Sequence, residues 1–160
     1  LADRGPSDND QRHRLVVSGT FGDGSSAAVR RALAGFSIGW VYSYASAAPF
    51  NIVTGADNNN DTTVNDRPAG VGRNSGRLPC FDVLTRPCGT ATFDMRVARS
   101  IALGATRLEL LLEGFNLFNR ANVVNVNNTI GNGITPSPAF KQVTAVGDMR
   151  QFQLGTRWSF

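Results

Sequence analysis

The chain is poor in the charged residues that favour helices, and it has no long apolar run. Of its 16 basic residues only Lys141 is a lysine, and of its 12 acidic residues only Glu109 and Glu113 are glutamates. Because Glu and Lys are good helix formers, their scarcity argues against a helical fold. No run of eighteen apolar residues occurs either, which excludes a transmembrane helix.

Signatures of catalysis and of nucleic-acid binding are also missing. His13 is the only histidine, and no Ser or Cys motif surrounds a candidate nucleophile. Glu109 and Glu113 would lie about 13 Å apart along an extended strand, too far for a glycosidase pair. The net charge of +4 comes from arginines spread along the whole chain. We therefore expect neither an enzyme nor a nucleic-acid partner.

What the sequence does contain is an alternation of apolar and polar residues with a period of two. Near the C-terminus, Leu154 and Trp158 share one face, and Gln153 and Arg157 share the other. This is the period of a β-strand with two chemically different faces. It recurs in five segments, which we predict to be strands: 12–22, 35–50, 91–104, 106–118 and 149–160.

The connections between these segments differ in length. Gly104–Ala105 is a minimal turn, whereas 51–91 and 119–149 are long, rich in Asn, Asp, Gly and Pro, and carry little sign of a core. Structureless loops of that length are uncommon in a compact soluble domain. Outer-membrane β-barrels, by contrast, combine short periplasmic turns and long extracellular loops with strands that are apolar on their lipid side.

We therefore predict an all-β fold in the bacterial outer membrane, made of antiparallel up-and-down strands, with residues 1–160 forming a single barrel segment. Ten residues of strand tilted by about 45° cover about 23 Å, close to the apolar band of such barrels. Five strands are too few to close, so we expect an incomplete barrel. The alternative is a secreted β-sandwich binding module, with or without calcium dependence, which would recognise carbohydrate or protein through the 51–91 loop.

The short turn also predicts a register. If Gly104–Ala105 is a two-residue type II′ hairpin loop, Leu103 pairs with Thr106. Arg96 then lies directly opposite Glu113 on the polar face, which predicts a cross-strand ion pair. In the same register Arg99 falls on the apolar face opposite Leu110, which is costly within a bilayer unless a bulge or snorkelling relieves it.

Two cysteines lie close together in the Pro- and Gly-bearing stretch LPCFDVLTRPCG. They are Cys80 and Cys88, and no histidine near them could complete the four ligands of a zinc site. We predict a local disulfide formed in an oxidising compartment. The alternative is a pair of free surface thiols.

A run of Asp and Asn residues suggests a cation site. Asp57, Asn59 and Asp61 have the D-x-N-x-D spacing of calcium loops, and Asn65 or Asp66 could complete the shell. The glycine and the bidentate glutamate of such loops are absent, and Asx-rich turns are common in solvated loops. Calcium bound by Asp57, Asn59, Asp61 and Asp66 is thus one hypothesis, and we expect no other cofactor.

The segment from Glu113 to Asn122, EGFNLFNRAN, resembles a signature near the end of TonB-dependent outer-membrane receptors. The run NDRPAGVGRNS, 65–75, is similar to a loop of the large carboxypeptidase-regulatory-like, Oar-like members of that family. The final residues, 148–160, resemble the family's last strand, which closes on an aromatic carboxy-terminus, here Phe160.

The resemblance implies energy-coupled uptake of a solute across the outer membrane. It also implies a barrel of about twenty-two strands filled by a plug domain. Because residues 1–10 lack the apolar core of a signal peptide, we expect a C-terminal piece of such a receptor. Its expected partners are the missing strands and plug, TonB, the barrel-assembly machinery and outer-membrane lipid.

Overall fold

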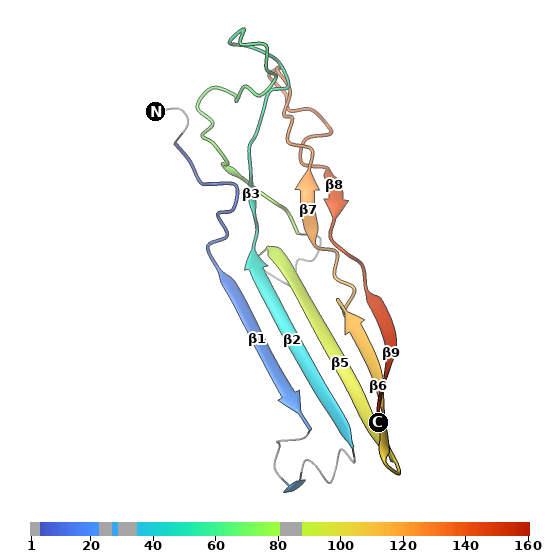
Figure 1. Ribbon diagram of the computed structural model, residues 1–160. Helices are drawn as coiled ribbons and strands as arrows, with labels where there is room; N and C mark the ends of the chain where they lie inside the picture. Colours follow the sequence, from blue (N-terminus) through green and yellow to red (C-terminus); the bar gives the residue numbers. More distant parts are fainter. Residues whose placement is uncertain (1–3, 23–26, 29–34, 81–87) are drawn as a thin grey trace. The chain divides into compact units, whose positions relative to one another are not determined.

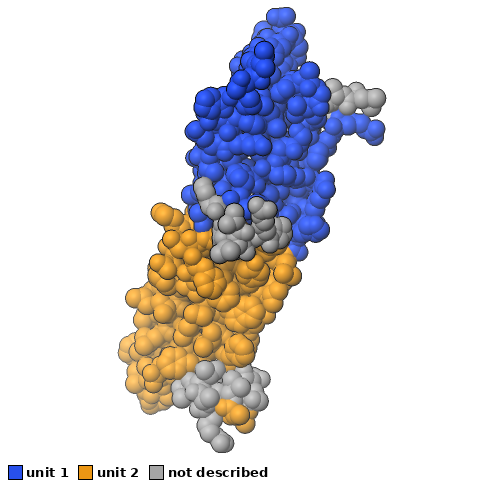
Figure 2. Space-filling view, turned by 180° about the vertical axis from the view of Figure 1, so that it is seen from behind, with its two compact units in different colours: residues 1–14, 45–90, 121–147 blue, residues 15–44, 91–120, 148–160 orange. Residues whose placement is uncertain are grey.

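The computed structural model describes residues 4–22, 27–28, 35–80 and 88–160. Its contacts divide the chain into two compact units, coloured separately in Figure 2. We call residues 15–44, 91–120 and 148–160 the sheet unit, and residues 1–14, 45–90 and 121–147 the loop unit. The sequence pattern predicts a single segment, whereas the contacts separate two units. No helix in the described part of the chain is long and apolar enough to cross a membrane.

The main feature of the fold is one antiparallel sheet of five strands (Figure 1). Its order is β1-β2-β5-β6-β9, so the strands of this sheet lie side by side in the order in which they occur along the chain. β1 and β9 are the two edges, and the barrel is not closed. This confirms the predicted fold class. The strands are β1 (Arg14–Phe21), β2 (Phe36–Ser46), β5 (Gly89–Leu103), β6 (Thr106–Phe115) and β9 (Gln151–Ser159).

The β5–β6 hairpin has the predicted turn and register. Leu103 pairs with Thr106, and pairing continues without a shift to Met95 and Gly114. Gly104 has a φ of 65°, whereas Ala105 is not among the residues with positive φ. This combination is that of a type II′ turn, in which only the first central residue needs the left-handed region. The Thr106 hydroxyl adds a hydrogen bond of 3.0 Å to the Leu103 carbonyl oxygen.

The sheet presents an apolar face that no second layer buries. Side chains that the register places on this face remain widely exposed, among them Leu154 at 85%, Trp158 at 62% and Leu112 at 43%. A β-sandwich would bury them in its core. The β-sandwich alternative is therefore wrong, and the exposed face is what a lipid-facing barrel wall requires.

Arg99 lies within this apolar face without a bulge. It pairs directly with Leu110 in an uninterrupted ladder. The Arg99 guanidinium lies 4.8 Å from the centre of the ring of Phe36, the first residue of β2. A cation–π contact with this ring thus accommodates the charge on the apolar face.

The loop unit is not structureless, which corrects the sequence analysis. β3 (Pro49–Phe50) pairs with β4 (Gly76–Arg77), and β7 (Val123–Val126) pairs with β8 (Val143–Val146). These strands are too short to show a period of two in the sequence. They enclose a small core built from Leu78, Val123 and Val126, with Ala47, Ala48, Phe50 and Val143 packed against it.

The two long loops are also joined to each other. The Asn128 side-chain amide donates to the Asn51 carbonyl oxygen at 2.9 Å, and Val53 forms a parallel bridge with Thr129. The Ile130 N–H donates to the Val53 carbonyl oxygen at 2.8 Å. Backbone N–H and C=O groups that would bond to water in an isolated loop are thereby hydrogen-bonded within the loop unit.

Candidate functional site

The signature segment Glu113–Asn122 is organised by a buried asparagine, Asn116, which is 4% exposed. Its N–H donates to Asp94 Oδ1 at 2.8 Å, and its side-chain amide donates to the carbonyl oxygens of Arg120 and Asp148, both at 2.9 Å. Its Oδ1 accepts from the Arg120 N–H at 3.0 Å. Asn116 thus fastens the end of β6 to β5 and to the residues before β9.

A second asparagine of the signature continues this connection. Asn119 Oδ1 accepts from the Arg150 N–H at 3.0 Å, and the Asn119 N–H donates to the Asn116 carbonyl oxygen at 2.7 Å. Both asparagines have positive φ, 47° at Asn116 and 50° at Asn119. Asparagine is among the non-glycine residues that most readily adopt this conformation. The repeated F-N of the sequence is the signal that could have identified these two turns.

Gly114 supplies the space for the signature to fold back. A Cβ at Gly114 would lie 2.5 Å from Leu117 Cδ2 and 3.1 Å from Phe152 Cε1. The neighbouring rings extend the same region, since Phe93 stacks on Trp40 with centroids 5.9 Å apart and lies 5.3 Å from Phe118. The signature is thus a packed corner of the sheet unit.

The polar face of the sheet carries two cross-strand ion pairs. Arg96 and Glu113 are directly opposed, with Nη1 and Oε1 3.8 Å apart. Glu109 is paired with Arg157 of β9, with Nη1 and Oε2 3.5 Å apart, a contact that follows from the β6–β9 register. A hollow of about 380 Å³ lies on the sheet unit; Ser18, Thr20, Asp94, Arg96 and Glu113 are among its lining residues.

The predicted calcium ligands lie in one loop, but their carboxylate oxygens accept hydrogen bonds from backbone N–H groups of the same loop. Asp57 Oδ2 accepts from the Thr62 N–H at 2.8 Å, and Asp61 Oδ1 accepts from the Thr63 N–H at 2.8 Å. Asp66 Oδ2 accepts from the N–H groups of Asn58 and Asn59, at 2.5 and 3.0 Å. The described residues contain no group of three His, Cys, Asp or Glu placed to hold a metal. Calcium binding stays a prediction.

Asp61 shows the electrostatic effect of these bonds. The Asn59 side-chain amide, which donates to Asp61 Oδ2 at 3.0 Å, lowers the pKa of the Asp61 carboxyl group. The Thr63 N–H acts in the same direction. Hydrogen bonds to the charged form therefore keep this carboxylate ionised in the folded loop.

Cys80 and Cys88 form the predicted disulfide, with Cα atoms 5.2 Å apart. The free-thiol alternative is wrong. The residues enclosed by this bridge, 81–87, lie outside the described part of the chain. Phe160 follows β9 and is fully exposed; its role as a terminal signature stays a prediction.

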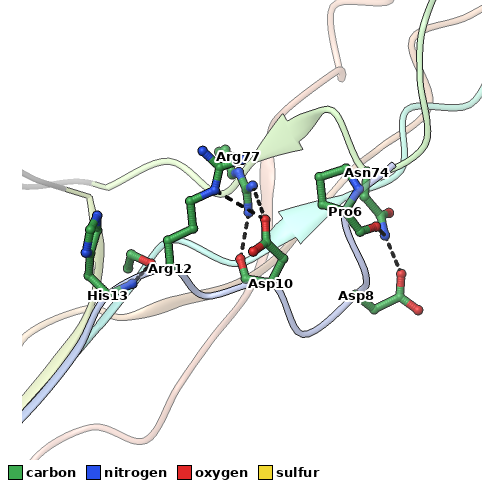
Figure 3. Close-up of polar contacts among 8 residues, drawn as sticks. Pro6, Asp8, Asp10, Arg12, His13, Asn74 and Arg77 are labelled. Carbon is green, nitrogen blue, oxygen red and sulfur yellow. Dashed lines mark hydrogen bonds and ion pairs between the residues drawn. The ribbon is translucent and has the colours of Figure 1, made fainter. Parts of the chain in front are cut away.

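A cluster that sequence reasoning missed fastens the segment before β1 to the end of the 51–91 loop (Figure 3). Asn74, 2% exposed, donates through Nδ2 to the Pro6 carbonyl oxygen at 2.9 Å and to Asp8 Oδ1 at 2.6 Å. Arg77 donates through Nη1 to the Asp10 carbonyl oxygen at 2.8 Å and through Nη2 to Asp10 Oδ2 at 2.6 Å. More than sixty residues separate these partners in the sequence, so no local sequence pattern predicts that they are in contact.

Comparison with known proteins agrees with this geometry. Residues 1–153 match the family described as Outer membrane beta barrel domain. The chain belongs to the outer membrane beta barrel domain family. No curated protein and no solved structure matches it.

Membership of the outer membrane beta barrel domain family places the chain in the bacterial outer membrane. In such barrels the apolar side of each strand faces lipid and the polar side faces the lumen. The ion pairs Arg96–Glu113 and Glu109–Arg157 therefore belong to the lumen wall. By the pattern of such barrels, we expect the two-residue turn at Gly104 on the periplasmic side and the long loops on the extracellular side.

Proposed function

We propose that this chain is the C-terminal part of a TonB-dependent receptor, which takes up a solute across the outer membrane with energy passed through TonB. The observation that carries the proposal is the signature Glu113–Asn122. Its asparagines at 116 and 119 make specific bonds to β5 and to the residues directly before β9. Because these hydrogen bonds require asparagine at both positions, the likeness of this segment to the receptor signature is better explained by a shared fold than by chance.

Such a receptor needs parts that lie beyond these five strands. The edge strands β1 and β9 would pair with further strands of the parent barrel, because unpaired backbone groups in hydrocarbon cost several kcal/mol each. A plug domain would fill the lumen, and its contacts would include the charged polar face. TonB, the barrel-assembly machinery and outer-membrane lipid complete the proposed partners.

The test uses the full-length parent protein purified in detergent. We expect it to be retained on a column that carries the periplasmic domain of TonB. The matched control is the same protein with the segment before its plug domain deleted, which should pass through. A parent protein that encodes no plug domain and is not retained would overturn the proposal.

A further inference from the structure

Three side chains that can carry positive charge line a hollow in the loop unit, next to the first residue of β1. The hollow has a volume of about 240 Å³. Arg12, His13 and Arg77 line it, together with Ser46, Ala47 and Cys88. Figure 3 draws the side chains of Arg12, His13 and Arg77 with the polar contacts of this cluster. None of them belongs to the signature segment or to the Asp- and Asn-rich loop.

The one acidic group in contact with these side chains, among the described residues, is Asp10. Arg77 Nη2 lies 2.6 Å from Asp10 Oδ2, and Arg12 Nε lies 3.6 Å from the same oxygen. The Arg77 hydrogen bond lowers the pKa of the Asp10 carboxyl group, so Asp10 is ionised at neutral pH. Two guanidinium groups and one carboxylate leave one net positive charge.

Asp10 orients the two arginine side chains but leaves some of their N–H donors available for a ligand. A guanidinium has five N–H groups, and two bonds to Asp10 occupy only part of the Arg77 set. The Arg12 side chain is 69% exposed and the Arg77 side chain 35%. The Ser46 hydroxyl accepts from the His13 N–H at 3.2 Å, which leaves its own O–H to donate. The hollow therefore offers several donors and a positive charge to one ligand.

Hydrogen-bond donors that carry positive charge favour an oxyanion as the ligand of this hollow. Guanidinium groups match the geometry of phosphate and bind it through parallel charge-assisted hydrogen bonds. The position fits as well, because β1 begins at Arg14 and β2 ends at Ser46, at the extracellular ends of these strands. Lipid headgroups lie at that level, and basic pockets at a membrane surface bind their phosphates.

We propose that the hollow lined by Arg12, His13 and Arg77 binds a phosphate group, either free or carried by a lipid headgroup. The inference is independent of TonB-dependent transport. It requires only that the extracellular ends of β1 and β2 lie at the outer surface of the membrane.

The experiment titrates the full chain in detergent with two probes. One arm uses inorganic phosphate followed by calorimetry, and the other uses detergent micelles doped with phosphatidic acid, against phosphatidylcholine as the zwitterionic comparison. We expect millimolar binding of phosphate in at least one arm. Arg12→Gln should weaken it about fivefold or more, the effect of losing one charge-assisted contact.

The matched control is Arg4→Gln, because Arg4 is an exposed arginine of the same segment that does not line the hollow. It makes the same change in net charge and should alter binding less than about twofold. Equal loss in both variants would show non-specific charge attraction and would overturn the proposal. Absence of binding in both arms would overturn it too.

Asp10→Asn separates binding from a structural role of the cluster. The amide still accepts a hydrogen bond from Arg77 but removes the competing negative charge, so phosphate should bind more tightly. Unchanged or weaker binding, with the fold intact by circular dichroism, would contradict the proposed site. Binding confined to phosphatidic acid would identify a lipid headgroup, and equal competition by inorganic phosphate would identify the free ion.

Discussion

At the scale of single residues, Asn116 joins the end of β6 to β5 and to the residues before β9. It combines near-complete burial with a left-handed backbone and five hydrogen bonds to four residues. No other amino acid offers a side-chain donor and acceptor of this length with the same tolerance of positive φ. The asparagine is thus required for both its backbone and its side chain.

Asn116→Ala should lower the free energy of unfolding by about 2–4 kcal/mol. The alanine loses the side-chain bonds to the carbonyl groups of Arg120 and Asp148 and to the Arg120 N–H, and it strains the left-handed backbone. Urea denaturation of the chain in detergent measures the change. The control is Asn132→Ala, an exposed loop position, which should change stability by no more than about 0.5 kcal/mol. Equal effects of the two substitutions would contradict this account of Asn116.

Gly114→Ala should destabilise the corner by about 1–3 kcal/mol, because the new methyl group would overlap Leu117 and crowd the Phe152 ring. Gly155→Ala is the matched control. A Cβ at Gly155 would lie 3.6 Å from Leu111, an ordinary contact, so this variant should be tolerated. Thermal unfolding of both variants compares them, and an equal loss would show that glycine matters only for strand flexibility.

The contact between Asp10 and Arg77 should depend on pH. The pKa of Asp10 is lowered below its ordinary value of 3.8, so the stability it contributes is present above that value and is lost as the pH falls through the lower folded-state pKa. Hydrogen exchange of residues 4–13 should therefore accelerate in acid more than intrinsic exchange predicts. Asp10→Asn should remove most of this dependence. A wild-type profile as flat as that of Asp10→Asn would refute the linkage.

At the scale of elements, the hairpin shows what the sequence can predict. Gly104 alone determines the turn type, and the turn then determines every pair from Leu103–Thr106 to Met95–Gly114. The short strands of the loop unit show the opposite case. β3 and β4 have two residues each, and their pairing joins Phe50 to Gly76, so neither periodicity nor a local turn reveals it.

The same reasoning separates the predicted sites from the missed ones. The bridge Cys80–Cys88 and the pair Arg96–Glu113 join residues that are close in sequence or related by one turn. The cluster of Asp10 with Arg77 depends on the path of a whole loop. No sequence motif indicates the path of that loop, so the contact could not be predicted without the folded structure of the loop unit.

At the scale of the whole molecule, the two open edges of the sheet determine how the chain behaves alone. β1 and β9 are edges, and the apolar face is exposed. The purified chain should aggregate without detergent and self-associate through its edges in detergent. Light scattering and chemical cross-linking measure this. A closed monomer with all strand amides protected would contradict the open sheet.

The topology of the two units also implies an order of assembly. Within the sheet, β5 and β6 are joined by a two-residue turn, so this hairpin can form at small loss of chain entropy. The loop unit instead joins residues 77 positions apart, as in the bond from Asn128 to Asn51. Such distant segments meet only after the intervening strands have paired. The extracellular surface should therefore acquire its structure last, after the wall that carries it is already in the membrane.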